Sequence, residues 1–385
     1  MLRNSVKWII SGLLIFMLVA PVSICAADDG DLSPVLNKGR KWRIGYYEGG
    51  PYINYPANLR AIVAGLVELG WMAPLTIPAT SDDTDAKAVW DYLVHHAQSR
   101  YIEFVADGFW SANWETEKRK ALKDQIIQRL NRPGQIDFMI AMGTWAGQDL
   151  ANNLHSTPTM AVSVSDPVRS GISATAEDSG LDHIHARCDP TRYIRQLRLF
   201  HRLIKFKKLG VVYENTPVGR TYAAFDDIQK VAKERNFKVV LCECPFSNVD
   251  QKVSTDRLIQ CHQELAQQVD AVFITVHRGV DLDRMAEILA PLMKNKIPTW
   301  SQRGPVEVKK GVLFSISRGG FKAAGRFHAE VMARIFHGEK PRSIGQIFED
   351  PKLIAVNTET ARRIGYPIPK SILRIANEIY DTIEE

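Results

Sequence analysis

The 385-residue sequence lacks several features that would restrict its function at once. No apolar stretch after residue 26 is long enough to cross a bilayer, so the sequence predicts a soluble protein once that segment is removed. Lysine and arginine form no long basic run and the formal net charge is only +6, so nothing indicates nucleic-acid binding. Charged residues make up 24% and hydrophobic residues 45%, which is typical of a globular chain and, at this length, predicts two domains.

Motifs for catalysis and for metal binding are also missing. There is no G-x-S-x-G turn and no H-E-x-x-H helix, so we expect no catalytic residues and no enzyme. His183, His185 and Cys188 lie close in sequence, but their spacing matches no closed zinc pattern, and we expect neither a metal nor a cofactor. The segment Arg318–Gly320 resembles a phosphate loop only loosely, because no Lys-Ser/Thr follows it.

The N-terminus has the pattern of a secretory signal peptide. Basic Arg3 and Lys7 precede an uncharged apolar run, and small residues around Ala26 offer a cleavage site. We therefore predict a signal peptide over residues 1–26 and a periplasmic or otherwise extracytoplasmic mature protein. Lipid anchoring at Cys25 is the alternative, although Ile24 stands where a lipobox has a small residue.

Four cysteines remain after such a cleavage: Cys188, Cys242, Cys244 and Cys261. Cys242 and Cys244 would point to the same side of a strand and would not readily bridge each other. Pairing of either one with Cys261, on a helix that should pack on that strand, is one interpretation. Free buried thiols are the other.

Strand and helix patterns alternate from Trp42 to the end of the chain, which predicts an α/β fold with parallel sheets covered on both faces. A polar segment at 173–185, predicted to be a loop, divides the strands between two sheets. Strands are expected at 43–47, 71–77, 101–105, 136–142, 159–164, 209–213, 238–242, 271–276, 297–301, 312–317 and 354–356. The main helices are expected at 57–69, 85–99, 115–130, 190–204, 219–236, 251–268, 281–294, 321–337, 358–364 and 372–383.

Small polar residues follow two strands that should be neighbours in one sheet. Gly143 and Thr144 follow the strand at 136–142, and Ser165 and Asp166 follow the strand at 159–164. Ligands of open α/β sheets bind at the carboxyl ends of strands, where glycine permits close approach and helix N-termini favour anions. These four residues could therefore bind a ligand carboxylate, and simple helix capping is the alternative.

Aromatic and hydrogen-bonding residues recur at other predicted strand ends, which is typical of a cleft where rings stack on a ligand. The segments concerned are Tyr46–Tyr52, Tyr213–Thr216, Val276–Gly279 and Trp300–Arg303. The recurrence, more than any one segment, favours a small-molecule site at these strand ends.

With these patterns in place, the chain resembles the extracytoplasmic substrate-binding proteins of ABC importers, in the group that includes tryptophan- and tyrosine-binding members. The resemblance covers nearly all of the chain after the signal segment. It rests on the segments Met142–Gln148, Val164–Val168 with Gly171, Gly210–Tyr213, Lys296–Thr299, Ala333–Pro341, Val356–Asn357, Ala361, Gly365 and Ile368–Pro369.

The resemblance implies two Rossmann-like lobes with parallel sheets, joined by a hinge in the type I periplasmic-binding-protein architecture. One lobe would hold residues 42–167 and about 300–340, and the other 168–299 and about 341–385. Closure of the lobes would bury a ligand. The ligand-binding residues carried over by position are Tyr47, Gly143, Thr144, Ser165 and Asp166 in the first lobe and Tyr213, Asn215, His277 and Arg278 in the second.

The sequence departs from the family pattern after the strand at 271–276. Members that bind amino acids typically have an Asp-Asn pair there, whereas this chain has His277 and Arg278. Arg278 would favour a carboxylate or phosphate over an ammonium group. The family's Asn-Ser after the Tyr213 strand is also not clear in Thr216–Thr221. The departure predicts an anionic or neutral, aromatic small molecule rather than a plain aromatic amino acid.

We therefore expect a monomeric solute-binding protein that captures a small organic ligand and delivers it to an ABC permease in the membrane. Two other functions remain open at this point. The same fold could present its ligand to a membrane receptor or histidine kinase, and less readily it could be an extracytoplasmic enzyme.

Overall fold

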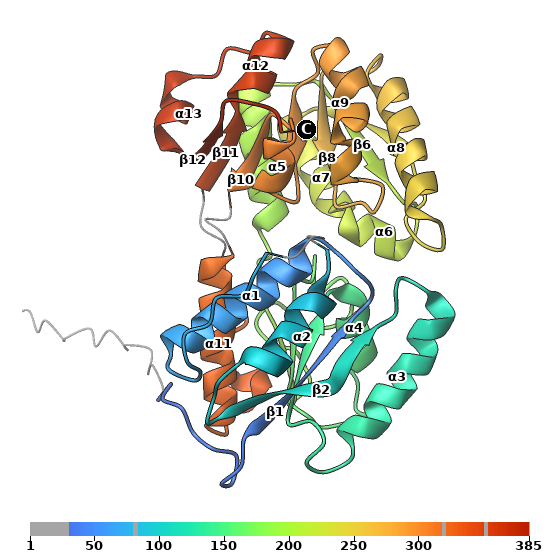
Figure 1. The fold of residues 1–385 in the computed structure, drawn as a ribbon. Helices are drawn as coiled ribbons and strands as arrows, with labels where there is room; N and C mark the ends of the chain where they lie inside the picture. The colour runs from blue at the N-terminus through green and yellow to red at the C-terminus, as the bar shows by residue number, and fades with distance from the viewer. Residues whose placement is uncertain (1–30, 80–83, 318–320, 350–352, 385) are drawn as a thin grey trace, which may run out of the picture. The chain divides into compact units, whose positions relative to one another are not determined.

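A computed structural model describes residues 31–79, 84–317, 321–349 and 353–384, all within one compact unit, Asp31–Glu385. The predicted signal peptide and Cys25 lie outside the described residues. Figure 1 shows the α/β folding of the chain.

The first sheet has five parallel strands in the order β2-β1-β3-β4-β5. These are β1 (Trp42–Glu48), β2 (Ile102–Ser111), β3 (Phe138–Met142), β4 (Thr159–Val162) and β5 (Ile184–Ala186). One face packs on α1 (Asn54–Glu68), α2 (Ala86–His96) and α11 (Lys322–Phe336), and the other on α3 (Thr116–Leu130) and α4 (Thr144–Leu150). Burial on both faces explains the continuous apolar run of β3.

The second sheet has seven strands in the order β12-β11-β10-β9-β8-β6-β7, and all neighbours are parallel except β10 and β11. They are β6 (Lys208–Tyr213), β7 (Lys238–Glu243), β8 (Ala271–Ile274), β9 (Thr299–Ser301), β10 (Phe314–Ser317), β11 (Leu353–Asn357) and β12 (Ala376–Tyr380). One face packs on α5 (Arg192–Ile204), α7 (Phe225–Arg235) and α12 (Thr358–Ile364), and the other on α8 (Gln251–Leu265) and α9 (Met285–Lys294). Short helices complete this part: α6 (Pro217–Tyr222), η1 (Leu282–Arg284), α10 (Pro305–Lys309), η2 (Pro341–Ser343) and α13 (Lys370–Ile375).

The sheet order changes the predicted lobe boundaries. Strand β5 belongs to the first sheet although it follows residue 168, and β9 and β10 belong to the second sheet. Helix α11 then packs against α1 of the first lobe, as Figure 1 shows, before the chain re-enters the second sheet at β11. The chain thus passes between lobes after β5, after β10 and before β11, so each lobe is discontinuous.

Several local predictions were wrong, and three of them concern the type or continuity of an element. Residues 71–77 form no strand, because Trp71 and Met72 instead fill the core beside α1 and α2. The helix expected at 219–236 is broken into α6 and α7 at Ala224, which has a left-handed φ of 52°. The helix expected at 372–383 ends at Ile375, and the chain continues as the edge strand β12 beside β11.

Glycine allows α11 to lie close against α1. A Cβ added to Gly325 would come 2.3 Å from the backbone carbonyl carbon of Ala61, and one added to Gly65 would come 2.8 Å from Cβ of Ala329. Side chains at either position would force the helices apart. This contact fixes α11 in the first lobe even though the strands on either side of it belong to the second sheet.

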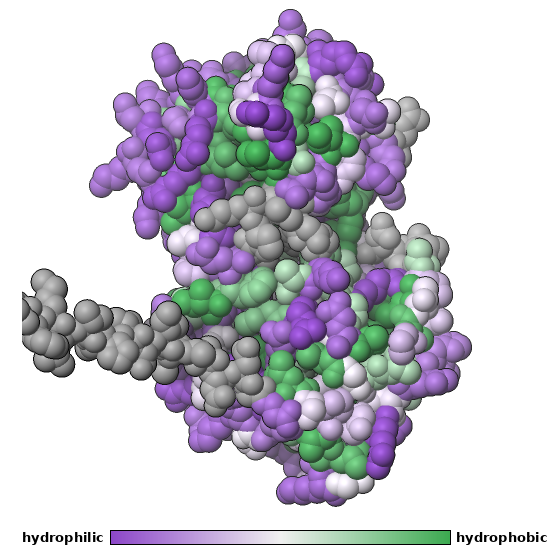
Figure 2. Space-filling view, turned by 90° about the vertical axis from the view of Figure 1, so that its left-hand side faces the viewer, coloured by the Kyte–Doolittle hydropathy of each residue, from purple (hydrophilic) through white to green (hydrophobic). Residues whose placement is uncertain are grey.

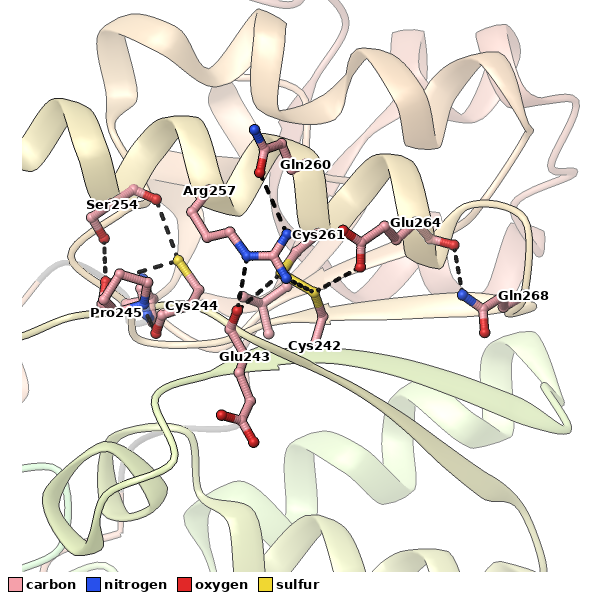
Figure 3. The surroundings of a disulfide bond; sticks show 12 residues. Cys242, Glu243, Cys244, Pro245, Ser254, Arg257, Gln260, Cys261, Glu264 and Gln268 are labelled. Carbon is pink, nitrogen blue, oxygen red and sulfur yellow. Dashed lines mark hydrogen bonds and ion pairs between the residues drawn. A yellow bond between two sulfur atoms is a disulfide. The ribbon is translucent and has the colours of Figure 1, made fainter.

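Cys242 on β7 and Cys261 on α8 form a disulfide with a Cα–Cα distance of 5.6 Å. Figure 3 shows the bond between strand and helix, with Arg257 beside it. The structure thereby selects one of the pairings left open by the sequence. Cys188 and Cys244 are free and buried, and burial raises the pKa of each of these thiols to about 12.

We expect the double substitution Cys242→Ala, Cys261→Ala to lower the free energy of unfolding by roughly 3 kcal/mol, because the bond closes a loop of about 20 residues. Urea denaturation measures the loss. A reducing agent should destabilise the unsubstituted protein to a similar extent and leave the double variant unchanged. Equal stability of the unsubstituted protein with and without reductant would contradict the bond's role.

Hydrophilic side chains cover much of the face drawn in Figure 2, with hydrophobic side chains between them. Among the described residues, no helix has the length and apolar character needed to cross a membrane.

Candidate functional site

Side chains from the carboxyl ends of both sheets contact one another. The Trp114 ring, after β2, lies 6.1 Å from the Phe246 ring, which follows β7. The Thr116 hydroxyl donates a hydrogen bond of 2.9 Å to Oδ1 of Asn248. These contacts join the first lobe to the second at the edge where α/β proteins bind ligands. We call the region between these strand ends the cleft.

Aromatic rings from both lobes pack against one another at these strand ends in a connected series. Trp114 meets Trp145 edge-on at 5.4 Å, and Tyr222 lies 4.9 Å from Phe246. Burial raises the pKa of Tyr222, and the nearby Thr144 side chain opposes that shift. Aromatic rings with polar groups beside them are the usual composition of a small-molecule site, and here they join the two lobes.

A buried ion pair lies beneath this aromatic series. Arg303 and Glu307 have side chains only 3% and 0% exposed, with 3.2 Å between Nε and Oε1. The Ser301 hydroxyl donates to Glu307 Oε2 at 2.6 Å. Burial raises the pKa of Glu307, and the charge of Arg303 opposes that shift. The Arg303 guanidinium also lies 5.1 Å from the Tyr52 ring centre, so the pair supports the contact between lobes.

A second buried carboxyl, Glu48, ends β1. The Tyr46 hydroxyl donates to it at 2.8 Å and the Ser111 hydroxyl at 3.0 Å. Burial raises the pKa of Glu48 to about 7, and both hydrogen bonds oppose the shift. Glu48 therefore changes its charge near neutral pH.

The structure brings three of the predicted site residues into the cleft. Gly143 has a positive φ of 86° and lies directly against Tyr55, and the Thr144 side chain lies near Tyr222. Ser165 lines a cavity of about 50 Å³ together with Tyr52 of the first lobe and Val276, which follows β8 of the second lobe. Their role in binding a ligand stays a prediction.

The Asp166 and Tyr47 side chains both form hydrogen bonds to residues of the first lobe. Asp166 Oδ1 accepts from the backbone N–H of Arg169 at 3.0 Å, and the Arg169 guanidinium also binds Asp227 at 3.1 Å. Tyr47 is fully buried and donates to Asp149 Oδ2 at 2.8 Å, because it faces the core under α3 and α4 rather than the cleft.

The resemblance implies that Tyr213 and Asn215 of the second lobe face the cleft. In the structure, both side chains contact other residues of the second lobe. Tyr213 is buried and stacks on Phe225 at 5.3 Å. Asn215 is exposed, donates to Glu243 at 2.9 Å and accepts from Arg220 at 2.7 Å. Tyr213 thus packs within its own lobe, whereas Asn215 lines a pocket of about 580 Å³ together with Arg169, which follows β4 of the first lobe.

The His277 and Arg278 side chains also bind their own lobe. His277 Nε2 donates to the Cys244 carbonyl at 3.1 Å and Nδ1 accepts from the Gly279 N–H at 3.0 Å. Burial lowers the pKa of His277 to about 4, so the ring is neutral with both nitrogens engaged. Arg278 Nη1 donates to the Val249 carbonyl at 2.9 Å. The prediction of an anionic ligand relied on Arg278, and this hydrogen bond within its own lobe removes that support.

Sequence reasoning missed most of the aromatic residues of the cleft. The sequence analysis did not place Trp114 at a strand end, because it predicted that this strand ends at residue 105, whereas β2 continues to Ser111. Phe246 lies beyond the end of β7, in a turn that no motif marks. Tyr52 and Arg303 fell within strand-end segments that the sequence had singled out, and Trp145 fell within the segment Met142–Gln148.

Replacing Gly143 by alanine should cost more stability than the same change at Gly171. Both have left-handed φ values, 86° and 71°, but an added Cβ at Gly143 would lie 1.8 Å from the Tyr55 hydroxyl and one at Gly171 would meet nothing within 4 Å. We expect an extra loss of about 1–3 kcal/mol from this overpacking. Urea denaturation of the two variants checks it, and equal losses would show that Tyr55 does not pack there.

Comparison with known proteins identifies the family. Residues 109–380 match the family described as ABC transporter substrate binding protein. The chain belongs to this family. The family consists of substrate-binding proteins rather than enzymes, and the match begins in β2 and runs through both sheets.

Similar members support the same assignment. A tyrosine-binding protein of Clostridioides difficile (strain R20291) is 24% identical over 235 residues, which are 59% of this chain and 63% of that protein. The alignment thus spans less than two thirds of this relative's length.

Solved structures share the fold of this substrate-binding protein. An ABC domain from Streptococcus pneumonia in complex with L-Trp has a TM-score of 0.66 and 16% identity, and the match covers 88% of this chain and 99% of that one. A ligand-free, open substrate binding protein with adhesive properties from Clostridium difficile has a TM-score of 0.60 and 19% identity over 89% of this chain and 100% of that one. The predicted two-lobed α/β architecture of the type I periplasmic-binding proteins is confirmed.

Proposed function

We propose that this chain is the extracytoplasmic solute-binding protein of an ABC importer and that it captures a small organic molecule in the cleft. The observation that carries the proposal is the meeting of side chains that follow the carboxyl ends of strands in the two sheets, Trp114 with Phe246 and Thr116 with Asn248. A ligand held there would contact both lobes at once. Its binding energy would favour the closed arrangement that a membrane permease can recognise.

The aromatic lining supports a ligand with a flat or aromatic body, because rings bind such bodies by stacking. The relative named for tyrosine binding and the neighbour in complex with L-Trp agree with that body. The buried carboxyls near the strand ends already have partners within the chain. Glu307 is paired with Arg303, and Glu48 accepts two hydrogen bonds within the chain.

We also propose that residues 1–26 direct the chain out of the cytoplasm and are then removed, and that the mature protein acts as a monomer. The disulfide between Cys242 and Cys261 supports this location, since such bonds persist in oxidising compartments.

A thermal-shift screen of the mature chain against amino acids, aromatic acids and other small metabolites tests the proposal. We expect at least one compound to raise the melting temperature, and Trp114→Ala to abolish the rise by removing a ring of the cleft. Trp42→Ala is the matched control, because Trp42 stacks on Phe336 within the first lobe at 4.4 Å, away from the cleft. Trp42→Ala should retain the ligand effect.

Two results would contradict the proposal. One is a screen in which no compound stabilises the protein, and the other is a ligand effect that survives in Trp114→Ala. Chemical conversion of a bound compound during incubation would instead favour an enzyme, and recovery of the compound intact is the expected result.

A further inference from the structure

One guanidinium group of the first lobe reaches the second lobe. Arg169 lies in the segment between β4 and β5, both strands of the first sheet, and its Nη2 lies 3.1 Å from Oδ1 of Asp227 on α7. Its Nε lies 3.6 Å from Oδ2 of Asp226, in the same first turn of that helix. Helix α7 packs on the second sheet. Arg169 therefore forms an ion pair between the lobes.

Three carboxylates, from both lobes, lie around this guanidinium group. Asp166 of the first lobe lies 3.5 Å from it, and Asp226 and Asp227 belong to the second lobe. The Asp227 side chain is only 8% exposed. Burial raises the pKa of Asp227, the charge of Arg169 opposes that shift, and the charges of Asp166 and Asp226 add to it. Without the Arg169 charge, carboxylates of the two lobes would repel each other.

The ion pair lies beside the cavity of about 50 Å³ that Ser165 lines. Ser165 and Tyr193 line both this cavity and an outer pocket of about 350 Å³, whereas Arg169 and Asp227 line the outer pocket but not the cavity. The Tyr193 hydroxyl, on α5 of the second lobe, donates to the Ser165 carbonyl at 3.3 Å. The ion pair can therefore hold the lobes together without contacting a molecule in the cavity.

We propose that Arg169 is a positioning residue that holds the two lobes closed through Asp226 and Asp227. An ion pair that exists only when the lobes meet stabilises the closed state alone, and so raises the fraction of molecules that are closed. A ligand that binds the closed lobes would gain apparent affinity in proportion to that fraction, although Arg169 does not line the cavity. The proposal concerns closure whichever compound the cleft binds, so its test needs no ligand.

The test measures closure of the ligand-free mature chain by chemical cross-linking. Thr116→Cys and Asn248→Cys together place one thiol on each lobe, at two side chains that are hydrogen-bonded at 2.9 Å when the lobes meet. Dibromobimane becomes fluorescent once both of its arms have reacted with thiols, so the rate at which fluorescence appears reports the closed fraction. This double-cysteine protein is the reference, and the chain without the two new thiols gives the background.

We expect Arg169→Gln to lower the cross-linking rate of the reference roughly 3- to 10-fold, an effect between those of exposed and buried ion pairs. Arg169→Lys should keep most of the rate, because it retains a cation among the carboxylates. Arg198→Gln is the matched control and should leave the rate unchanged, because Arg198 lies 2.7 Å from Glu234 at similar exposure but within the second lobe. Raising the salt from about 0.05 M to about 1 M should slow the reference and leave Arg169→Gln nearly unchanged, since salt screens the pair.

Three results would overturn the proposal: Arg169→Gln reacts as fast as the reference, Arg169→Lys is as slow as Arg169→Gln, or Arg198→Gln is equally slow. If Arg169→Gln fails to fold, as circular dichroism would show, Asp226→Asn takes its place as a change at an exposed carboxylate of the same ion pair. An unchanged rate for Asp226→Asn would then overturn the proposal. Closure that depends on Arg169 in a chain that no screened compound stabilises would contradict the proposed function and leave this proposal standing.

Discussion

Arg303→Ala should lower the free energy of unfolding by about 3–5 kcal/mol, because it would leave the fully buried Glu307 carboxyl without its cation. The substitution also removes the guanidinium above the Tyr52 ring and the hydrogen bond from Arg303 Nη2 to the His277 carbonyl, 3.3 Å long. Chemical denaturation at neutral pH measures this loss.

Lys87→Ala is the matched control for removal of one cation from an ion pair. Lys87 and Asp91 lie 2.6 Å apart, but their side chains are 51% and 46% exposed, so solvent screens the interaction. We expect a cost below about 1 kcal/mol there. The double variant Arg303→Met, Glu307→Leu should recover much of the loss, because no unpaired buried charge remains. If Arg303→Ala lowers the free energy of unfolding no more than Lys87→Ala does, the buried ion pair does not make the stability contribution expected of it.

Glu48 should make the protein less stable as the pH rises from about 4.5 to about 7. Its pKa in the folded chain is raised by burial from 4.5 to about 7, so in this window the folded state holds a proton that the unfolded state has released. Stability falls with pH wherever the folded state binds more protons, and the full shift corresponds to about 3 kcal/mol. The loss is complete above about pH 7.

Glu48→Gln isolates this contribution from those of other titrating groups. The variant has no carboxyl at this position, so the difference in unfolding free energy between it and the unsubstituted protein should change by up to about 3 kcal/mol between pH 4.5 and pH 7. Urea denaturation across this range gives the difference at each pH. A difference that is independent of pH would show that Glu48 is ionised throughout.

Much of the fold was predictable because buried parallel strands are recognisable from short apolar runs between helices. Strand β3, with five buried residues in succession, is the clearest case. The predictions were wrong where tertiary contacts outweigh local pattern. Trp71 has the apolar character of a strand residue but fills a gap in the core, and β5 is a three-residue strand that begins at the end of the polar segment 173–185.

The candidate site was harder to predict than the fold. Strand-end position found Gly143, Thr144 and Ser165, because the carboxyl edge of a parallel sheet is a local property of the chain. It did not show which way a side chain turns, so Tyr47 and His277 were placed in the cleft although the structure has them hydrogen-bonded in the interior.

Hydrogen–deuterium exchange with and without the ligand identified by the thermal-shift screen tests the central claim most directly. If the ligand is held between the lobes, backbone amides at 143–147 and 163–167 in the first lobe and at 275–279 and 301–304 in the second should all exchange more slowly when it is bound. Protection confined to one lobe, or located away from these strand ends, would contradict a ligand site in the cleft.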